Sequence, residues 1–353
     1  MADWAATNVR HEFEYYTVDP GTWKDVKRLT NIKTCSITRD MEQDTLGSAT
    51  IDSDGVFGES YIRAYLIVIQ NGVKEKVPLG TFLVQTPSSS YDGKVSSISM
   101  DAYTPLIELK ENQPPLGFFV AENTNIMDKA AELVSEHLRA PVVATKSDDT
   151  MYKDFVSNGD DTWMTFLSDM IANADFYFAL DEMGRVLFAP KQDTASLQPV
   201  FTYNDDNSSI LYPEITVDHD LYGVPNVVEV IYSDSSDLYI SRVVNDDPNS
   251  PISTISRGRE ITERIENPEF SGIPTQKMID EYAEQQLRSL STLAYTVSYK
   301  HGYNNVRIGD CVRLNYERAG IVNIKARVVS QTISCENGCP VSEKATFTAK
   351  LWR

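Results

Sequence analysis

A helix that leads directly into a hairpin, in residues 160–190, most constrains how this chain folds. Its apolar residues recur three or four positions apart, the spacing of one buried face on a helix of about three turns. The buried face consists of Trp163, Phe166, Leu167, Met170 and Ile171. Asp160 or Asp161 stands just before the first of these residues and is the expected N-cap.

Two apolar runs follow this helix and predict a short hairpin. They cover residues 176–180 and 185–188, and the loop between them ends in Gly184, which can adopt the left-handed conformation. The helix and the hairpin lie near the middle of the chain, between two segments that are rich in strand patterns. We therefore interpret them as the hinge between two similar halves.

The strand patterns in residues 1–104 predict an N-terminal β-barrel domain. Runs with strand length and alternation recur between residues 23 and 103. Asn71-Gly72 is the strongest hairpin signal in the chain, because both residue types tolerate a positive φ. About five or six antiparallel strands joined by short turns are typical of a small barrel or sandwich.

The pattern of residues 105–200 predicts a small α+β insert that contains two helices and the aromatic hairpin. Thr124 is the expected cap of the first helix, which Pro141 ends. Both helices are amphipathic, so their apolar faces need a partner, and we expect the hairpin to cover them.

Residues 201–353 predict a second β-barrel domain with one helix, which Thr275 caps. The stretch 245–272 is rich in Asp, Asn, Pro, Ser and Arg and predicts a long loop that is functional or contacts a partner. The expected fold class is therefore α+β and mainly β, with two antiparallel β-barrel domains joined by a small α+β insert.

The charge balance argues against a protein that grips nucleic acid. The 353 residues include 32 basic and 51 acidic side chains, a net charge of −19, whereas phosphate neutralisation requires an excess of Lys and Arg. No apolar run approaches the length of about 18 residues that a membrane span needs. The N-terminus lacks a basic region followed by an apolar one, so the sequence shows no export signal.

No constellation of residues in the sequence predicts catalysis. The nucleophile-elbow, zinc-protease, P-loop and dinucleotide-binding motifs are absent. The four histidines are scattered along the chain and are expected to be solvated surface residues: His11, His137, His219 and His301. Cys335 and Cys339 favour free thiols in a loop over a disulfide or half of a metal site, because no further ligands stand at metal spacing. We expect no catalytic residue, no cofactor and no metal.

The order of several short motifs resembles the baseplate hub proteins of phage tails and contractile injection systems. One motif contains Val224, Pro225, Asn226, Val227 and Val228, and a later one contains Gly309 and Asp310. A helix ending in residues 284–288 and its following strand lie between the two motifs, and the stretch 160–188 resembles the helix and hairpin of the same family. The resemblance covers residues 25–353. Each motif also has a local role: Pro225 suits the start of a strand, and Gly309-Asp310 suits a tight turn.

This resemblance implies a structural, non-enzymatic protein with two tail-tube-like barrels per chain. Three chains would close into a ring whose barrels match the sixfold tail tube, while a trimeric central spike binds the other side. The implied partners are therefore two further copies, the tail tube protein, the spike protein and baseplate wedge proteins. DNA would pass through an acidic channel without sequence-specific binding. The chain carries no appended lysozyme or peptidase segment, so we expect any cell-wall cleavage to belong to another protein.

Two other classes of protein compete with this reading. A carbohydrate-binding or wall-degrading protein of the same tail tip would need exposed aromatic residues beside paired carboxylates, and the sequence contains no such constellation. A secreted β-rich adhesin would need an export signal. The hub reading places the chain in the virion baseplate, after assembly in the host cytoplasm.

Overall fold

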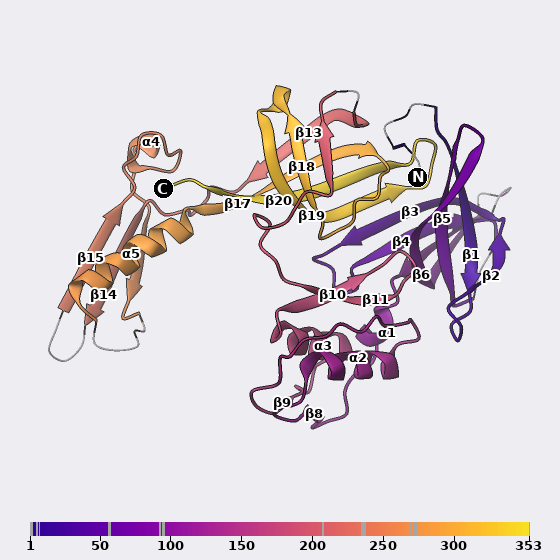
Figure 1. Ribbon diagram of the computed structural model, residues 1–353, viewed down its shortest axis with the longest axis horizontal. Helices are drawn as coiled ribbons and strands as arrows, with labels where there is room; N and C mark the ends of the chain where they lie inside the picture. The colour runs from indigo at the N-terminus through magenta and orange to yellow at the C-terminus, as the bar shows by residue number, and fades with distance from the viewer. Residues whose placement is uncertain are drawn as a thin grey trace. The chain divides into compact units, whose positions relative to one another are not determined.

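The structure is a computed structural model that describes residues 3–352 except 5, 7, 56–57, 92, 94–95, 207, 234–237, 269 and 271–273 (Figure 1). Its contacts divide the chain into two compact units. Unit 1 comprises Met1–Ile215 and Ser298–Ala345, and unit 2 comprises Thr216–Val297 and Thr346–Arg353. The predicted division into 1–104, 105–200 and 201–353 is a division along the sequence and stays a prediction.

The N-terminal strands of unit 1 form most of a large sheet. They are β1 (Arg10–Val18), β2 (Asp25–Leu29), β3 (Ile32–Asp40), β4 (Gly47–Ser53), β5 (Ser60–Gln70), β6 (Val73–Tyr91) and β7 (Ser96–Tyr103). Asn71 and Gly72 form the two-residue turn between β5 and β6, with φ of 50° and 79°. This confirms the predicted hairpin, because positive φ at both positions matches the twist of the flanking strands.

C-terminal strands continue the same sheet. They are β12 (Phe201–Asn204), β13 (Leu211–His219), β17 (Thr292–Gly302), β18 (Cys311–Tyr316), β19 (Ile321–Ser334) and β20 (Pro340–Lys350), with a 3-10 turn at Glu317–Ala319. The main path runs β13-β17-β20-β19-β3-β4-β7-β6-β5-β1-β2, and β18 joins β12 to β19. Strand β19 pairs with β3, so the two ends of the chain share one sheet.

The strand pairings confirm a mainly β fold of the α+β class but not the two predicted barrels. In the described residues the pairings close no barrel, and the two tail-tube-like barrels stay a prediction. The antiparallel prediction is wrong for two pairs, since β12 runs parallel to β18 and β14 (Val227–Ser233) runs parallel to β16 (Thr262–Glu266). A parallel pair needs a long crossover, and the chain passes from β14 to β16 through β15 (Leu238–Val244) and residues 245–261.

The α+β insert of unit 1 lies at one end of the large sheet, with its hairpin between the helices and the sheet (Figure 1). It contains α1 (Ile107–Lys110), β8 (Phe119–Val120), α2 (Ile126–His137), β9 (Phe155–Val156), α3 (Trp163–Ala172), β10 (Phe176–Leu180) and β11 (Val186–Pro190). The five residues predicted for the buried face of α3 are all at most 2% exposed. They pack against α2 and the hairpin in one apolar cluster.

The helix starts in the insert differ from the prediction by one or two residues. Thr162 caps α3 in place of Asp160 or Asp161, because Thr162 and Thr165 bond each other's backbone N–H groups. The carboxylate of Asp161 instead accepts from the backbone of Asn158. Asn125 caps α2 in place of Thr124 and accepts from the backbone N–H of Asp128.

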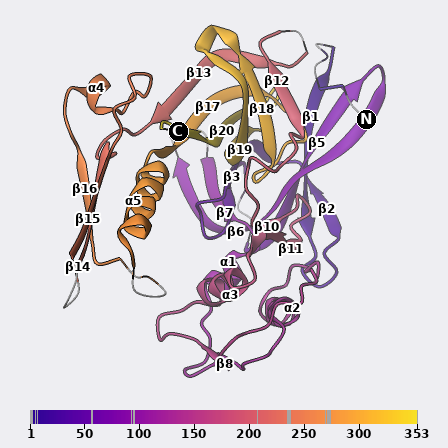
Figure 2. The ribbon, with the colours of Figure 1, turned by 60° about the vertical axis from the view of Figure 1, so that its left-hand side comes forward.

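Unit 2 is a three-stranded sheet in the order β15-β14-β16, with helix α5 (Gln276–Leu290) on one face (Figure 2). Thr275 caps α5, as predicted. Ile279, Ala283 and Leu287 of the helix pack on Val228 and Val230 of β14. The prediction of a loop over 245–272 is wrong in its described part, which contains helix α4 (Thr254–Arg257) and strand β16. Pairing with β14 satisfies polar backbone groups of β16, and the composition of the stretch does not reveal this pairing.

None of the described helices is long and apolar enough to cross a membrane.

Candidate functional site

The loop of the β10–β11 hairpin folds into a compact turn that projects onto the large sheet. Asp181 accepts from the backbone N–H of Arg185 at 2.8 Å and from its guanidinium at 2.6 Å. Gly184 has φ of +74°, as predicted, and a Cβ placed there would lie 2.7 Å from Cβ of Thr81. Glycine is therefore needed both for the backbone conformation and for the close approach of the loop to β6.

A buried arginine, Arg63, donates a hydrogen bond to this loop. Arg63 on β5 is 1% exposed and donates to Oγ1 of Thr81 at 2.8 Å and to Oδ1 of Asp25 at 2.7 Å. It also donates to the carbonyl of Met183 in the hairpin loop at 3.0 Å. The indole N–H of Trp23 donates to the same carbonyl at 2.7 Å. The N-terminal part of unit 1 thus holds the loop through the buried guanidinium of Arg63 and the indole of Trp23.

A second carboxylate joins the hairpin loop to both ends of the chain. Glu182 is 9% exposed, and its carboxylate lies 3.7 Å from the guanidinium of Arg39 on β3 and 2.6 Å from that of Arg307. Arg39 further donates to the carbonyl of Leu79 at 2.8 Å and to Gln331 at 3.2 Å. Burying Glu182 is possible because it is paired with two cations.

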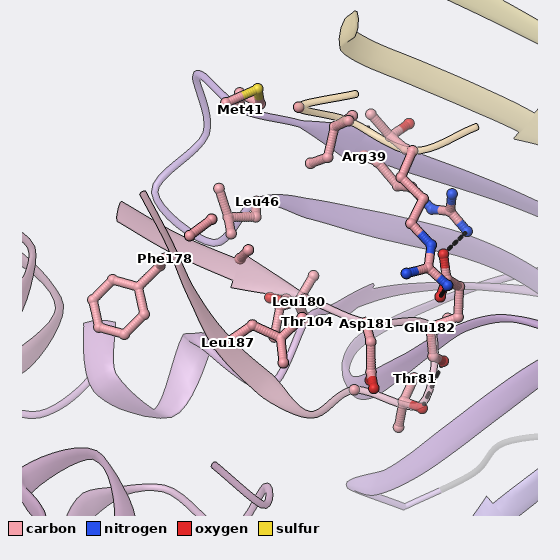
Figure 3. Close-up of a pocket in the computed structure, with 18 of the residues that line it drawn as sticks. Arg39, Met41, Leu46, Thr81, Thr104, Phe178, Leu180, Asp181, Glu182 and Leu187 are labelled. Atoms are coloured by element: carbon pink, nitrogen blue, oxygen red, sulfur yellow. Dashed lines mark hydrogen bonds and ion pairs between the residues drawn. The ribbon is translucent and has the colours of Figure 1, made fainter. Parts of the chain in front are cut away.

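Beside these ion pairs lies a cavity of about 240 Å³. Figure 3 shows its apolar side, where Leu46, Leu180 and Leu187 lie together, and its charged side, where Glu182 faces guanidinium groups. The lining residues that the structure describes include no histidine, cysteine or serine. Glu182 is paired with both guanidinium groups, so these ion pairs connect the hairpin loop to β3 and to the segment before β18.

Gly309 and Asp310, which the sequence motif singled out, form one wall of this cavity. Gly309 has φ of +89°, and a Cβ there would lie 3.3 Å from the hydroxyl of Tyr177 on β10. Burial raises the pKa of Asp310 above its ordinary value. The hydroxyl of Tyr177 also accepts from Arg327 at 2.6 Å, so the C-terminal strands contact the hairpin directly.

The other motif, Val224 to Val228, belongs to unit 2 and not to this site. Its five members are all buried, and Asn226 connects neighbouring segments within that unit. The Asn226 amide donates to the carbonyl of Arg259 at 3.0 Å and accepts from the backbone N–H of Ile261 at 2.7 Å. It thereby positions the start of β16 beside β14.

A second buried polar cluster surrounds His301 in unit 1. Glu343 accepts from the hydroxyl of Tyr299, from the amide of Gln331 at 2.5 Å, and lies 3.3 Å from Nε2 of His301. The hydroxyl of Tyr203 also lies 3.1 Å from that nitrogen. Burial raises the pKa of Tyr203 and of Tyr299 well above the ordinary value. The prediction of a solvated histidine is wrong at His301, because its carboxylate partner lies 42 residues away in sequence.

Removing the hydroxyl of Tyr299 tests how much its hydrogen bond to Glu343 contributes to stability. We expect Tyr299→Phe to lower the free energy of unfolding by about 1–3 kcal/mol, because it leaves an oxygen of buried Glu343 without a donor. Urea unfolding followed by circular dichroism measures the change. The control Tyr222→Phe, at a side chain that is 93% exposed, should have no effect. Equal free energies of unfolding for the two variants would show that the Tyr299–Glu343 hydrogen bond does not stabilise the fold.

Sequence reasoning missed the charged residues of the hairpin site: Arg39, Arg63, Glu182 and Arg307. Periodicity detects apolar faces, and it treats charged residues as solvated. Among the described residues, no group of three or more His, Cys, Asp or Glu side chains could hold a metal ion. Cys335 and Cys339 lie in the loop after β19, and their expected state as free thiols stays a prediction.

Comparison with solved structures relates this fold to phage tail proteins. The tail protein from Neisseria meningitidis MC58 matches with a TM-score of 0.59 and 11% identity over 95% of this chain and 96% of that one. The 43 kDa tail protein of prophage MuSo2 from Shewanella oneidensis matches with a TM-score of 0.60 and 12% identity over 95% and 98%. A chain of the lidded Francisella PdpA-VgrG complex matches with a TM-score of 0.54 and 8% identity, over 97% of this chain and 53% of that one.

No family model and no curated protein sequence matches the chain. The similarity to tail proteins is therefore one of fold, and at that level it confirms the resemblance inferred from the order of the motifs.

Proposed function

We propose that this chain, which has the fold of phage tail proteins, is the structural baseplate hub of a phage tail or a related contractile injection particle. The observation that carries the proposal is the match to two tail proteins over 95% of this chain and nearly all of each of theirs. In the proposed assembly three copies form a ring that adapts the sixfold tail tube to a threefold central spike.

The construction of unit 1 supports a structural role rather than an enzymatic one. Two of its buried charged residues, Arg63 and Glu182, connect the hairpin loop to strands from both ends of the chain. A ring component that transmits force between a tube and a spike needs such internal fastening. In the proposed hub, residues 1–104 and 201–353 supply the two tube-like domains, and residues 105–200 supply the insert between them.

The charge of the chain supports the proposed passage of DNA. With a net charge of −19, a ring of three copies would present an acidic wall that repels phosphate, so DNA would slide without binding. The proposed partners are the tail tube protein, the central spike protein and baseplate wedge proteins. The proposed location is the virion baseplate, with assembly in the host cytoplasm.

The mass of the purified protein in solution tests this proposal. We expect light scattering to give three times the 39.6 kDa of one chain, since closure into a ring buries barrel edges that are otherwise open to aggregation. A dilution series at physiological salt and particle images with threefold symmetry complete the measurement. A monomer at every concentration, both alone and with the tube protein, would contradict the hub and favour a carbohydrate-binding tail-tip protein, for which a glycan screen is the next step.

A further inference from the structure

Two cysteines that are 300 residues apart in sequence meet across the junction of β3 and β19. The register pairs Ile37 with Ile333 and Ser36 with Ser334, and the backbone N–H of Cys335 donates to the carbonyl of Cys35 at 2.9 Å. Cys35 and Cys335 are therefore opposite each other. Opposed residues in a hydrogen-bonded antiparallel pair have Cα atoms about 5.5 Å apart, which lies within the span of about 4.4–6.8 Å that a disulfide bridges.

The side chains of this pair face each other as well as the backbones. Tyr15 and Cys35 belong to one apolar cluster against which Cys335 packs, and directly opposed residues of an antiparallel pair lie on the same face of the sheet. The neighbouring side chain of Cys335, followed by burial, raises the pKa of Cys35 well above its ordinary value. Cys35 is 4% exposed, whereas Cys335 is half-buried at the end of its strand. Cys335 is thus the thiol that a reagent in solution reaches first.

Cys339 is the competing partner for Cys335 because it follows only four residues later. It is fully buried, and its φ of +43° fixes it in the turn that begins the next strand. Its backbone N–H is bonded to the carbonyl of Glu336 at 2.9 Å, so a bridge between Cys335 and Cys339 would have to form across this tight turn. A bridge between Cys35 and Cys335 leaves this turn unchanged, because the two residues are already opposite each other.

We propose that Cys35 and Cys335 are a site of oxidative modification, where a disulfide forms in an oxidising medium and bridges β3 to β19. With oxidised glutathione as the oxidant, the Cys335 thiolate attacks one sulfur and releases one glutathione thiolate. Cys35 then loses its proton and attacks the Cys335 sulfur of the mixed disulfide, which releases the second glutathione. Two protein thiols are oxidised and one glutathione disulfide is reduced. The bridge joins the N-terminal strands covalently to the C-terminal strands of the same sheet.

The folded, full-length chain incubated with oxidised glutathione tests this assignment by peptide mapping without reduction. We expect a cross-linked peptide pair that contains Cys35 and Cys335, loss of two of the four free thiols, and a rise in Tm of a few degrees. Cys335→Ala and Cys35→Ala should each abolish the cross-link and the rise in Tm. The matched controls Cys311→Ala and Cys339→Ala should retain both.

Peptide mapping of the wild-type chain shows whether Cys35 and Cys335 form the disulfide, even if a variant fails to fold. A Cys335–Cys339 bridge, glutathione adducts without a protein cross-link, or a Cys35–Cys335 bridge that appears only in denaturant would overturn the assignment.

Discussion

Replacement of Glu182 by alanine should lower the free energy of unfolding by about 3–5 kcal/mol, since it removes one partner of a buried ion pair. The guanidinium of Arg39 is nearly buried and would keep its charge without the carboxylate that lies 3.7 Å away. Arg307 is half-exposed and would recover solvation, so Arg39 carries most of the effect. Urea unfolding followed by circular dichroism, with wild type and variant side by side, measures the loss.

An exposed ion pair of the same unit supplies the control for this experiment. Asp44 and Lys110 are 2.8 Å apart, and both are well exposed, so Asp44→Ala should cost only about 0–1 kcal/mol. If Glu182→Ala cost no more than Asp44→Ala, the carboxylate would not be fastening the hairpin loop. Glu182→Gln separates charge from shape, because the amide keeps the volume but leaves the two guanidinium groups unneutralised.

Replacement of Trp163 by alanine should cost about 3–5 kcal/mol, the range for deleting a large aromatic side chain from a core. Trp163 is 2% exposed and lies where α3 meets α2. Its ring stacks on His137 of α2 at 4.1 Å between centroids and meets the edge of Phe118 at 5.0 Å. The cavity that the missing ring leaves adds to the cost of the lost apolar burial.

The same unfolding experiment measures the Trp163 variant, with circular dichroism as the signal because the mutation removes a fluorophore. Leu116→Ala is the control within the insert, since Leu116 is 91% exposed and its truncation should change stability by less than about 0.5 kcal/mol. Trp163→Phe should fall between the two. A loss below about 1.5 kcal/mol for Trp163→Ala would show that the insert does not depend on this contact.

Most elements governed by short-range rules could be predicted from the sequence. The apolar stripe of α3, the Asn71-Gly72 turn, the left-handed Gly184 and the Thr275 cap depend on residues close in sequence. The caps of α2 and α3 were misplaced by one or two residues, because several neighbouring Asp, Asn and Thr side chains can cap equally well before the fold selects one.

Short-range sequence rules could not predict most of the candidate site. Gly309 and Asp310 were found because a turn has a local signature. Arg63, Glu182 and His301 were not found, since each is buried only by partners that stand far away in the chain. A charged residue in isolation is assigned to the surface, and only the partner that neutralises it makes burial possible.

The sequence by itself therefore determined the mainly β character of this protein, its central helix and hairpin, and the order of motifs that resembles tail proteins. These features depend on periodicity and on backbone preferences that act over a few residues. Only the tertiary structure decided that β19 pairs with β3, that the hairpin loop is held by Arg63 and Glu182, and that Cys35 faces Cys335. Strand partners and register are selected by the packing of the whole sheet, which short-range patterns do not contain.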